Sequence, residues 1–197
     1  MLRVRVLMAT ADDATARSLK EMLTKMGYLV VARTRSTRDT LQSAFEMHPD
    51  VALVDAHLPD YGGLNVVQVL DEHHLLPVIV LARDADDILK YLVSAWVFGY
   101  LFLPCTETEL RVAVEVALAN FRRLAALEHE NLKLKRQLET RKVVERAKGL
   151  LMEKKKLTEG EAYRYLQKLS MDRAQPLARV AREVIEVLQK EAATSDG

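Results

Sequence analysis

This sequence contains little cysteine, no long apolar run and no marked excess of one sign of charge. Its 197 residues include a single cysteine, Cys105. One cysteine excludes an internal disulfide framework and is typical of proteins from a reducing compartment. The longest apolar runs, such as 78–82, are far shorter than the roughly 20 residues of a membrane helix, and MLRVRVLMAT lacks the layout of a signal peptide. We therefore expect a cytoplasmic protein.

The charges balance overall but are unevenly distributed. Residues 1–120 carry 11 basic and 16 acidic side chains, whereas residues 121–197 carry 18 and 12. An acidic first part and a basic second part indicate two modules, the second of which suits a polyanion. A solvated helical face rich in Lys and Arg would have the same composition, so charge alone leaves both interpretations open.

Short β-branched runs alternate with amphipathic stretches in the first half of the sequence. The predicted strands are 4–10, 29–34, 51–55, 77–82 and 100–104. The predicted helices between them are 13–26, 37–48, 64–74 and 86–98. This alternation predicts an α/β fold with a doubly wound, five-stranded parallel sheet. Its ligand site should lie at the carboxyl ends of the strands, where Thr10, Asp55, Ala82 and Leu103 fall.

A long helix is predicted after Pro104. Thr106 and Glu109 are spaced as a capping box, and no Gly or Pro interrupts the chain from there to Lys148. Such a helix would be roughly 65 Å long, too long to lie on one small sheet, so part of it must project.

The middle of this helix has a heptad pattern of leucines with one asparagine. An Asn at a single a position favours a parallel pair of helices, and the flanking charges would attract each other across that pair. We therefore expect a homodimer, with packing of the same leucines on the protein's own helices as the alternative. The predicted seam consists of Leu124, Asn131 and Leu138 at a positions and of Leu127 and Leu134 at d positions.

Two further helices are predicted near the end of the chain. A second capping box begins at Thr158, and Pro176 is a plausible first-turn proline. The predicted organisation is therefore a sheet domain at 1–120, a coiled-coil helix at 121–140, a small all-α three-helix bundle at 141–192 and a disordered tail at 193–197.

The first module resembles a response-regulator receiver domain over roughly residues 1–120. Asp55 closes the run VALVD and is followed by Gly62 and Gly63, and Tyr100 precedes Pro104 as an aromatic residue does in that family. The resemblance implies that Asp55 occupies the phosphoacceptor position and that Tyr100 occupies the switch position.

Most polar groups that the resemblance implies for acyl-phosphate chemistry are absent. Receivers supply an acidic pair for Mg²⁺, a Ser or Thr, and a Lys, but the corresponding positions hold Thr10 and Ala11, Ala82, and Leu103. Asp12 and Asp13 lie one or two residues late and would hold Mg²⁺ at Asp55 only weakly. We therefore expect a degenerate receiver that is not conventionally phosphorylated, with no cofactor beyond that weak ion. No arrangement of residues indicates a catalytic site, so we do not expect an enzyme.

The last part of the chain resembles the ANTAR family, an RNA-binding transcription antiterminator module. The matching motifs are the run AKG at 147–149, the run EAY at 161–163 and the corner at 171–173. The resemblance implies a dimeric regulator that binds hairpins in nascent RNA and prevents terminator formation. A sensor kinase or an inhibitory protein would be a further partner.

The residues of this module have the chemistry that RNA binding needs. Cations neutralise phosphates, an aromatic ring stacks on an unpaired base, and a helical glycine, which costs about 1 kcal/mol against Ala, permits close approach. Spacing with Leu166 predicts Tyr163 to be a core residue, which leaves Tyr165 as the stacking candidate. The predicted RNA-binding residues are Arg141, Lys148, Gly149, Tyr165 and Arg173.

Two other functions remain open at this point. Three small helices with a basic face also suit a DNA-binding helix-turn-helix regulator. A protein-binding scaffold that acts without phosphorylation is the third class, and its failure to bind either nucleic acid would not depend on salt.

Overall fold

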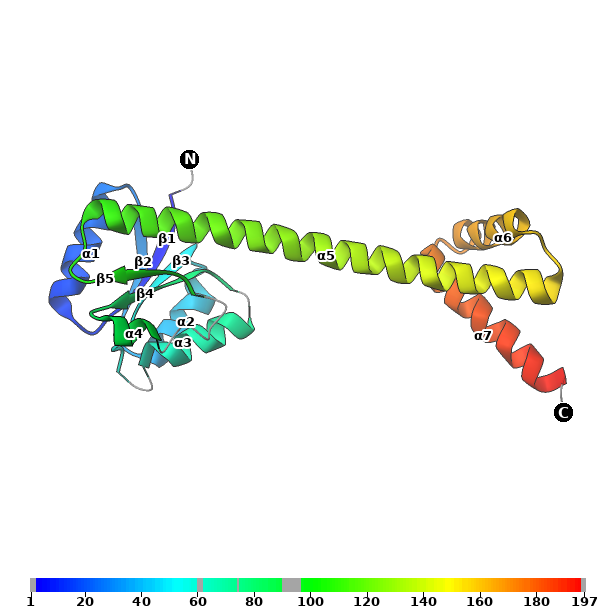
Figure 1. The fold of residues 1–197 in the computed structure, drawn as a ribbon, viewed down its shortest axis with the longest axis horizontal. Coiled ribbons are helices and arrows are strands. Elements are labelled where there is room, and N and C mark those ends of the chain that lie inside the picture. The colour runs from blue at the N-terminus through cyan, green and yellow to red at the C-terminus, as the bar shows by residue number, and fades with distance from the viewer. Residues whose placement is uncertain (1–2, 60–61, 74, 90–96, 196–197) are drawn as a thin grey trace. The chain divides into compact units, whose positions relative to one another are not determined.

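The computed structural model of the chain describes residues 3–59, 62–73, 75–89 and 97–195 (Figure 1). The chain divides into two compact units, Met1–Ala125 and Ala126–Gly197. Among the described residues, no helix combines the length and the apolar character needed to cross a membrane.

The first unit contains a five-stranded parallel sheet with the order β2-β1-β3-β4-β5. This confirms the predicted fold class. β-Branched residues suit these strands because both faces of the sheet are covered, and every residue of β3 and β4 is buried. The strands are β1 (Arg5–Ala9), β2 (Leu29–Thr34), β3 (Val51–Asp55), β4 (Val78–Ala82) and β5 (Val97–Phe102).

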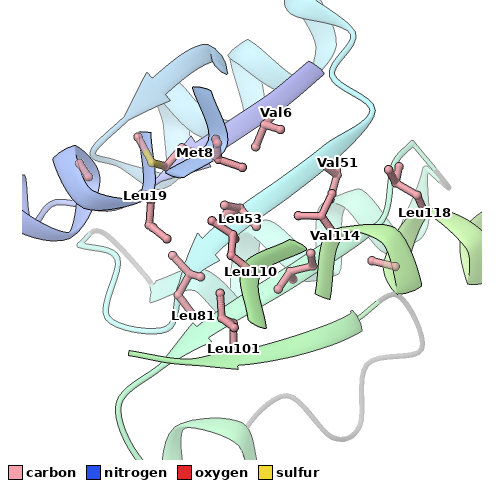
Figure 2. Close-up of a cluster of buried hydrophobic side chains, with 14 residues drawn as sticks. Val6, Met8, Leu19, Val51, Leu53, Leu81, Leu101, Leu110, Val114 and Leu118 are labelled. Atoms are coloured by element: carbon pink, nitrogen blue, oxygen red, sulfur yellow. The ribbon is translucent and has the colours of Figure 1, made fainter. Parts of the chain in front are cut away.

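Helices cover both faces of this sheet. The helices of the first unit are α1 (Asp13–Lys25), α2 (Thr37–Met47), α3 (Gly62–Glu72), α4 (Ala85–Leu89) and the beginning of α5 (Glu107–Lys155). Apolar residues of α1 and α5 pack on one face, as Figure 2 shows for Leu19, Leu110 and Val114. Residues of α2 and α3, among them Ala44 and Val66, pack on the other face.

One predicted boundary in this unit was wrong. The sequence pattern extended a helix from Asp86 to Phe98, but Phe98 lies in β5, and residues 90–96 are outside the described part of the chain. Phe98 packs against the buried cluster under α5, with its ring edge-on to Phe121 at 5.6 Å between centroids. Consecutive apolar residues fit a buried strand as well as a helix, so periodicity alone does not place this boundary.

The second unit contains the end of α5 together with α6 (Glu159–Asp172) and α7 (Leu177–Ser195). Their apolar faces form one core that includes Val144, Leu151, Leu166 and Ile185. The capping box at Thr158 is present, since its hydroxyl accepts from Glu161 N–H and the Glu161 carboxylate accepts from Thr158 N–H. Residues 193–195, predicted to be disordered, are the last helical residues of α7.

Candidate functional site

Asp55 ends β3 at the carboxyl edge of the sheet and is 2% exposed. The Thr10 hydroxyl, just after β1, donates a hydrogen bond to Asp55 Oδ2 at 2.7 Å. The backbone N–H of His57 donates to Asp55 Oδ1 at 3.0 Å. The fold therefore brings Asp55 and Thr10 together at the edge where a doubly wound sheet places its ligand site.

Arg83 forms a two-pronged ion pair with the same carboxylate. Its Nη1 lies 3.1 Å from Asp55 Oδ1, and its Nη2 lies 3.2 Å from Asp55 Oδ2. The Arg83 backbone N–H donates to Asp87 Oδ2 at 3.0 Å, which fixes the loop after β4. The sequence analysis missed Arg83, although its position directly after Ala82 was a visible signal.

His57 links this ion pair to a second buried carboxylate. Arg83 Nη1 lies 2.8 Å from His57 Nδ1, and a guanidinium can only donate, so Nδ1 accepts. The ring proton of neutral His57 is then on Nε2, which lies 3.3 Å from Oδ1 of the buried Asp87. Asp55, Arg83, His57 and Asp87 thus form one connected polar network.

Asp12 and Asp13, the residual acidic residues, have partners of their own. Asp12 caps α1 and accepts from the N–H groups of Ala14 and Thr15, and its pKa is lowered mainly by the hydrogen bonds from Thr15. Asp13 pairs with Arg33 and Arg35, and the hydrogen bond from Arg33 is the main cause of its lowered pKa.

Tyr100, at the switch position, is half-buried in β5 opposite Val80 of β4. Its ring packs against the cluster beneath α2 and α3. Burial raises the pKa of its hydroxyl, so the side chain is neutral at physiological pH.

Four of the five predicted RNA-binding residues line one of two pockets in the second unit, and Gly149 lines neither. Arg141 and Lys148 line a groove of about 1040 Å³ between α5 and the first turns of α6 and α7. Tyr165 and Arg173 line a separate pocket of about 110 Å³ between the three helices. The structure does not bring all five residues into one site.

Lys148 is buried, unlike most lysines, and is 7% exposed. Its ammonium lies 2.7 Å from Glu159 Oε1 and 3.0 Å from both carboxylate oxygens of Glu145. The hydrogen bonds to Glu159 and Glu145 raise the pKa of Lys148, and the same contact lowers the pKa of Glu159. This geometry gives Lys148 a structural role in joining α5 to the start of α6.

Gly149 and Tyr165 lie at the surface of the unit. Gly149 is exposed, and a Cβ built on it meets nothing within 4 Å, so packing inside the unit does not require a glycine there. Tyr165 is partly exposed, and the ammonium of Lys155 lies 5.6 Å from the centre of its ring.

Arg173 directly follows α6, and Tyr163 lies in the second turn of that helix. Arg173 is the C-cap residue of that helix and pairs with Glu183 of α7 at 2.8 Å. Tyr163 was predicted to be a core residue, and this was wrong: it is 40% exposed and lines the large groove, because Ala162 and Leu166 take the core positions of α6.

Comparison with known proteins also divides the chain into a receiver part and a helical part. Residues 6–115 match the response regulator receiver domain family, and residues 132–185 match the ANTAR domain family. The transcriptional regulatory protein PdtaR of Mycobacterium tuberculosis is 36% identical over 186 residues, which cover 93% of this chain and 90% of that protein. The chain belongs to the ANTAR response regulators.

Solved receiver domains share the fold of the first unit. The receiver domain of a modulated diguanylate cyclase from Desulfovibrio desulfuricans G20 aligns with a TM-score of 0.56 and 24% identity, covering 61% of this chain and 98% of that one. A response regulator from Chloroflexus aurantiacus J-10-fl aligns with a TM-score of 0.55 and 25% identity, covering 60% and 99%.

The receiver family implies a Mg²⁺ site beside Asp55, and the residues present do not fit one. A hard divalent cation needs several oxygen ligands with negative charge. Here Arg83 takes both Asp55 oxygens, Asp12 caps α1, and Asp13 pairs with two arginines. In the described part of the chain, no three His, Cys, Asp or Glu residues are grouped so that they could hold a metal ion. A cation brought to Asp55 would have to displace the guanidinium.

The leucines of the predicted seam lie along the ANTAR response regulator's longest helix, α5. Leu127, Leu134 and Leu138 are each more than half exposed, and Asn131 is also exposed. None of these four residues belongs to a buried cluster of the described chain. Leu127, Leu134 and Leu138 therefore do not pack on the described helices of their own chain, whereas Leu124 is half-buried.

Proposed function

We propose that this protein is a dimeric RNA-binding transcription antiterminator that binds hairpins in nascent RNA through its ANTAR unit. The observation that carries the proposal is the groove of that unit, where Lys133, Arg136 and Arg141 form no ion pair or side-chain hydrogen bond with any described residue. Unpaired cations on a folded domain favour binding of a polyanion, because each cation that neutralises a phosphate releases a counterion from the nucleic acid.

Dimerisation through the leucine seam is part of this proposal. Exposed leucines at heptad positions gain burial when two copies of α5 pair, and each is worth roughly 1.5 to 3 kcal/mol when fully buried. Asn131 at one a position favours a parallel register. A parallel pair would carry two ANTAR units, and the dimer would therefore bind two hairpins.

The receiver acts without conventional phosphorylation in this proposal. Both oxygens of Asp55 are engaged by Arg83, and the Lys and the Ser or Thr of the family's site are replaced by Leu103 and Ala82. Phosphoryl transfer depends on charge-stabilising groups that are each worth a few kcal/mol, so their loss would slow it by orders of magnitude. A protein partner that contacts the receiver, rather than a phosphoryl group, would then regulate the output. Neither unit acts as an enzyme in this account.

A competition experiment tests the nucleic-acid partner. Hairpin RNAs that share one stem and carry randomised loops are selected on the full-length protein, and a selected hairpin is then displaced by duplex DNA at fixed salt. We expect the hairpin to be displaced by unlabelled hairpin but not by an equal concentration of duplex DNA. Displacement by duplex DNA at the same concentration would instead identify a DNA-binding regulator. Absence of binding to either nucleic acid at low salt would favour the scaffold.

A further inference from the structure

The groove of the ANTAR unit extends along α5 beyond the part that the three-helix core covers. Val144 and Lys148 lie where α6 and α7 cover α5, and Leu132, Arg136 and Thr140 line the groove closer to the N-terminus of α5. Tyr163 of α6 forms part of the opposite wall. The N-terminal part of the groove therefore lies open, beyond the region of α5 that α6 and α7 cover.

The charges of the groove are positive once its ion pairs are counted. Lys148 pairs with Glu145 and Glu159, the two acidic residues of the lining, so this cluster keeps one negative charge and the lining as a whole carries a net charge of +2. Lys133, Arg136 and Arg141 remain without a partner among the described residues, and all three are exposed. An anionic ligand therefore fits this groove better than an apolar helix would.

An aromatic ring lines the same groove as these cations. Tyr163 is 40% exposed and lines the groove, although its helix has room in the core only for Ala162 and Leu166. Rings next to cations suit single-stranded nucleic acid, because every unpaired base has a face that can stack. Bases inside a paired stem are already stacked and do not offer those faces.

The part of the groove around Arg136 stays accessible if the protein dimerises through the leucine seam. At 3.6 residues per turn, Arg136 is offset by about 160° around α5 from both Leu134 and Leu138. The part of the groove at Arg136 therefore lies on the side of α5 opposite the seam and faces outward in a parallel pair. Arg141, seven residues after Leu134, lies on the seam side, just beyond the last leucine of the seam.

We propose that this groove binds the unpaired loop of the RNA hairpin, with Lys133, Arg136 and Arg141 contacting loop phosphates and Tyr163 stacking on one base. The inference rests on the proposed function and names its binding surface. Of the predicted RNA-binding residues, only Arg141 contacts RNA in this proposal, and Lys133, Arg136 and Tyr163 join it.

The test uses the full-length protein and a selected hairpin RNA. Arg136→Ala should weaken binding and lower the slope of log affinity against log salt by about 0.7, the value for one lost contact with a single strand. Tyr163→Ala should weaken binding by roughly tenfold, whereas Tyr163→Phe, which keeps the ring, should bind as the wild type does. Arg146→Ala is the matched control, because Arg146 is exposed on α5 but does not line the groove.

Four results would contradict the proposal, and each points to a different conclusion. If the wild type binds hairpins and the Arg136 and Tyr163 variants match Arg146→Ala, the groove is not the RNA site, although the proposed function stands. If a fully paired duplex RNA of the same stem binds as tightly as the hairpin, loop binding is wrong. If the groove variants change the sedimentation of the free protein, the groove is an interface between copies. If the wild type binds no RNA, the proposed function fails together with this inference.

Discussion

The ion pair between Arg83 and Asp55 should stabilise the receiver more than any exposed pair in the same unit. At 3.1 Å between Nη1 and Oδ1 and an effective dielectric of about 20, the Coulomb energy is about 5 kcal/mol. Desolvation of the nearly buried Asp55 offsets part of this, while Arg83, with 42% of its side chain exposed, keeps some hydration. We expect a net coupling of about 1 to 3 kcal/mol.

A double-mutant cycle measures this coupling. The variants are Arg83→Met, Asp55→Asn and their combination, and the readout is the free energy of opening of the β3 amides, obtained by hydrogen exchange on the full-length protein. Arg83→Met should be the most destabilising single change, because it leaves a buried carboxylate with only the hydrogen bonds from Thr10 and His57.

The exposed pair between Arg111 and Glu107, one turn apart on α5, is the matched control. Its coupling should not exceed about 0.5 kcal/mol. A coupling for Arg83 and Asp55 no larger than that of the control would refute the reasoning, because the guanidinium would then not hold the carboxylate in solution.

Three further predictions follow from the geometry. Asp55 should not accumulate an acyl phosphate when the protein is incubated with a small phosphodonor and Mg²⁺, and Asp55→Asn should leave hairpin affinity within about twofold of the wild type; a stoichiometric adduct in intact-mass spectra, with binding that depends on it, would contradict this. Leu134→Lys should weaken the dimer and Asn131→Leu should stabilise it while broadening the range of oligomers, as measured by sedimentation; an unchanged monomer in both variants would rule out the seam. Because Lys148 lowers the pKa of Glu159 below its ordinary 4.5, the stabilisation from this contact is present above that pH and is lost as the pH falls through the lowered pKa. Glu159→Gln should therefore lower the melting temperature of the ANTAR unit more at pH 7 than at a pH well below 4.5, and an equal effect at both would contradict the role of the contact.

The sheet and the helical tail were predictable because local chemistry and tertiary packing agree in them. The runs at 29–34 and 51–55 are β-branched and became strands with those bounds, and the capping box at Thr158 began a helix as expected. Phe98 was misplaced because its apolar neighbours suit either kind of element until the sheet edge is known.

The details of the sites depend on contacts that the sequence does not show. Arg83 is an ordinary basic residue after a strand until the fold brings it to Asp55, which is 28 positions earlier in the chain. Lys148 has the motif position of an RNA contact, but its burial and two glutamates appear only when α6 folds back on α5. Tyr163 has the helical spacing of a core residue, but Ala162 and Leu166 fill the core at this part of α6, and the Tyr163 side chain is exposed.

Transcription through a terminator tests the central claim most directly. A template is built whose transcript forms either a selected hairpin or an intrinsic terminator that shares one strand with it. In single-round transcription with purified polymerase, we expect the wild-type protein to increase read-through and Arg136→Ala to do so less, while Arg146→Ala matches the wild type. Unchanged read-through at protein concentrations that saturate the hairpin would contradict the assignment of this protein as an antiterminator.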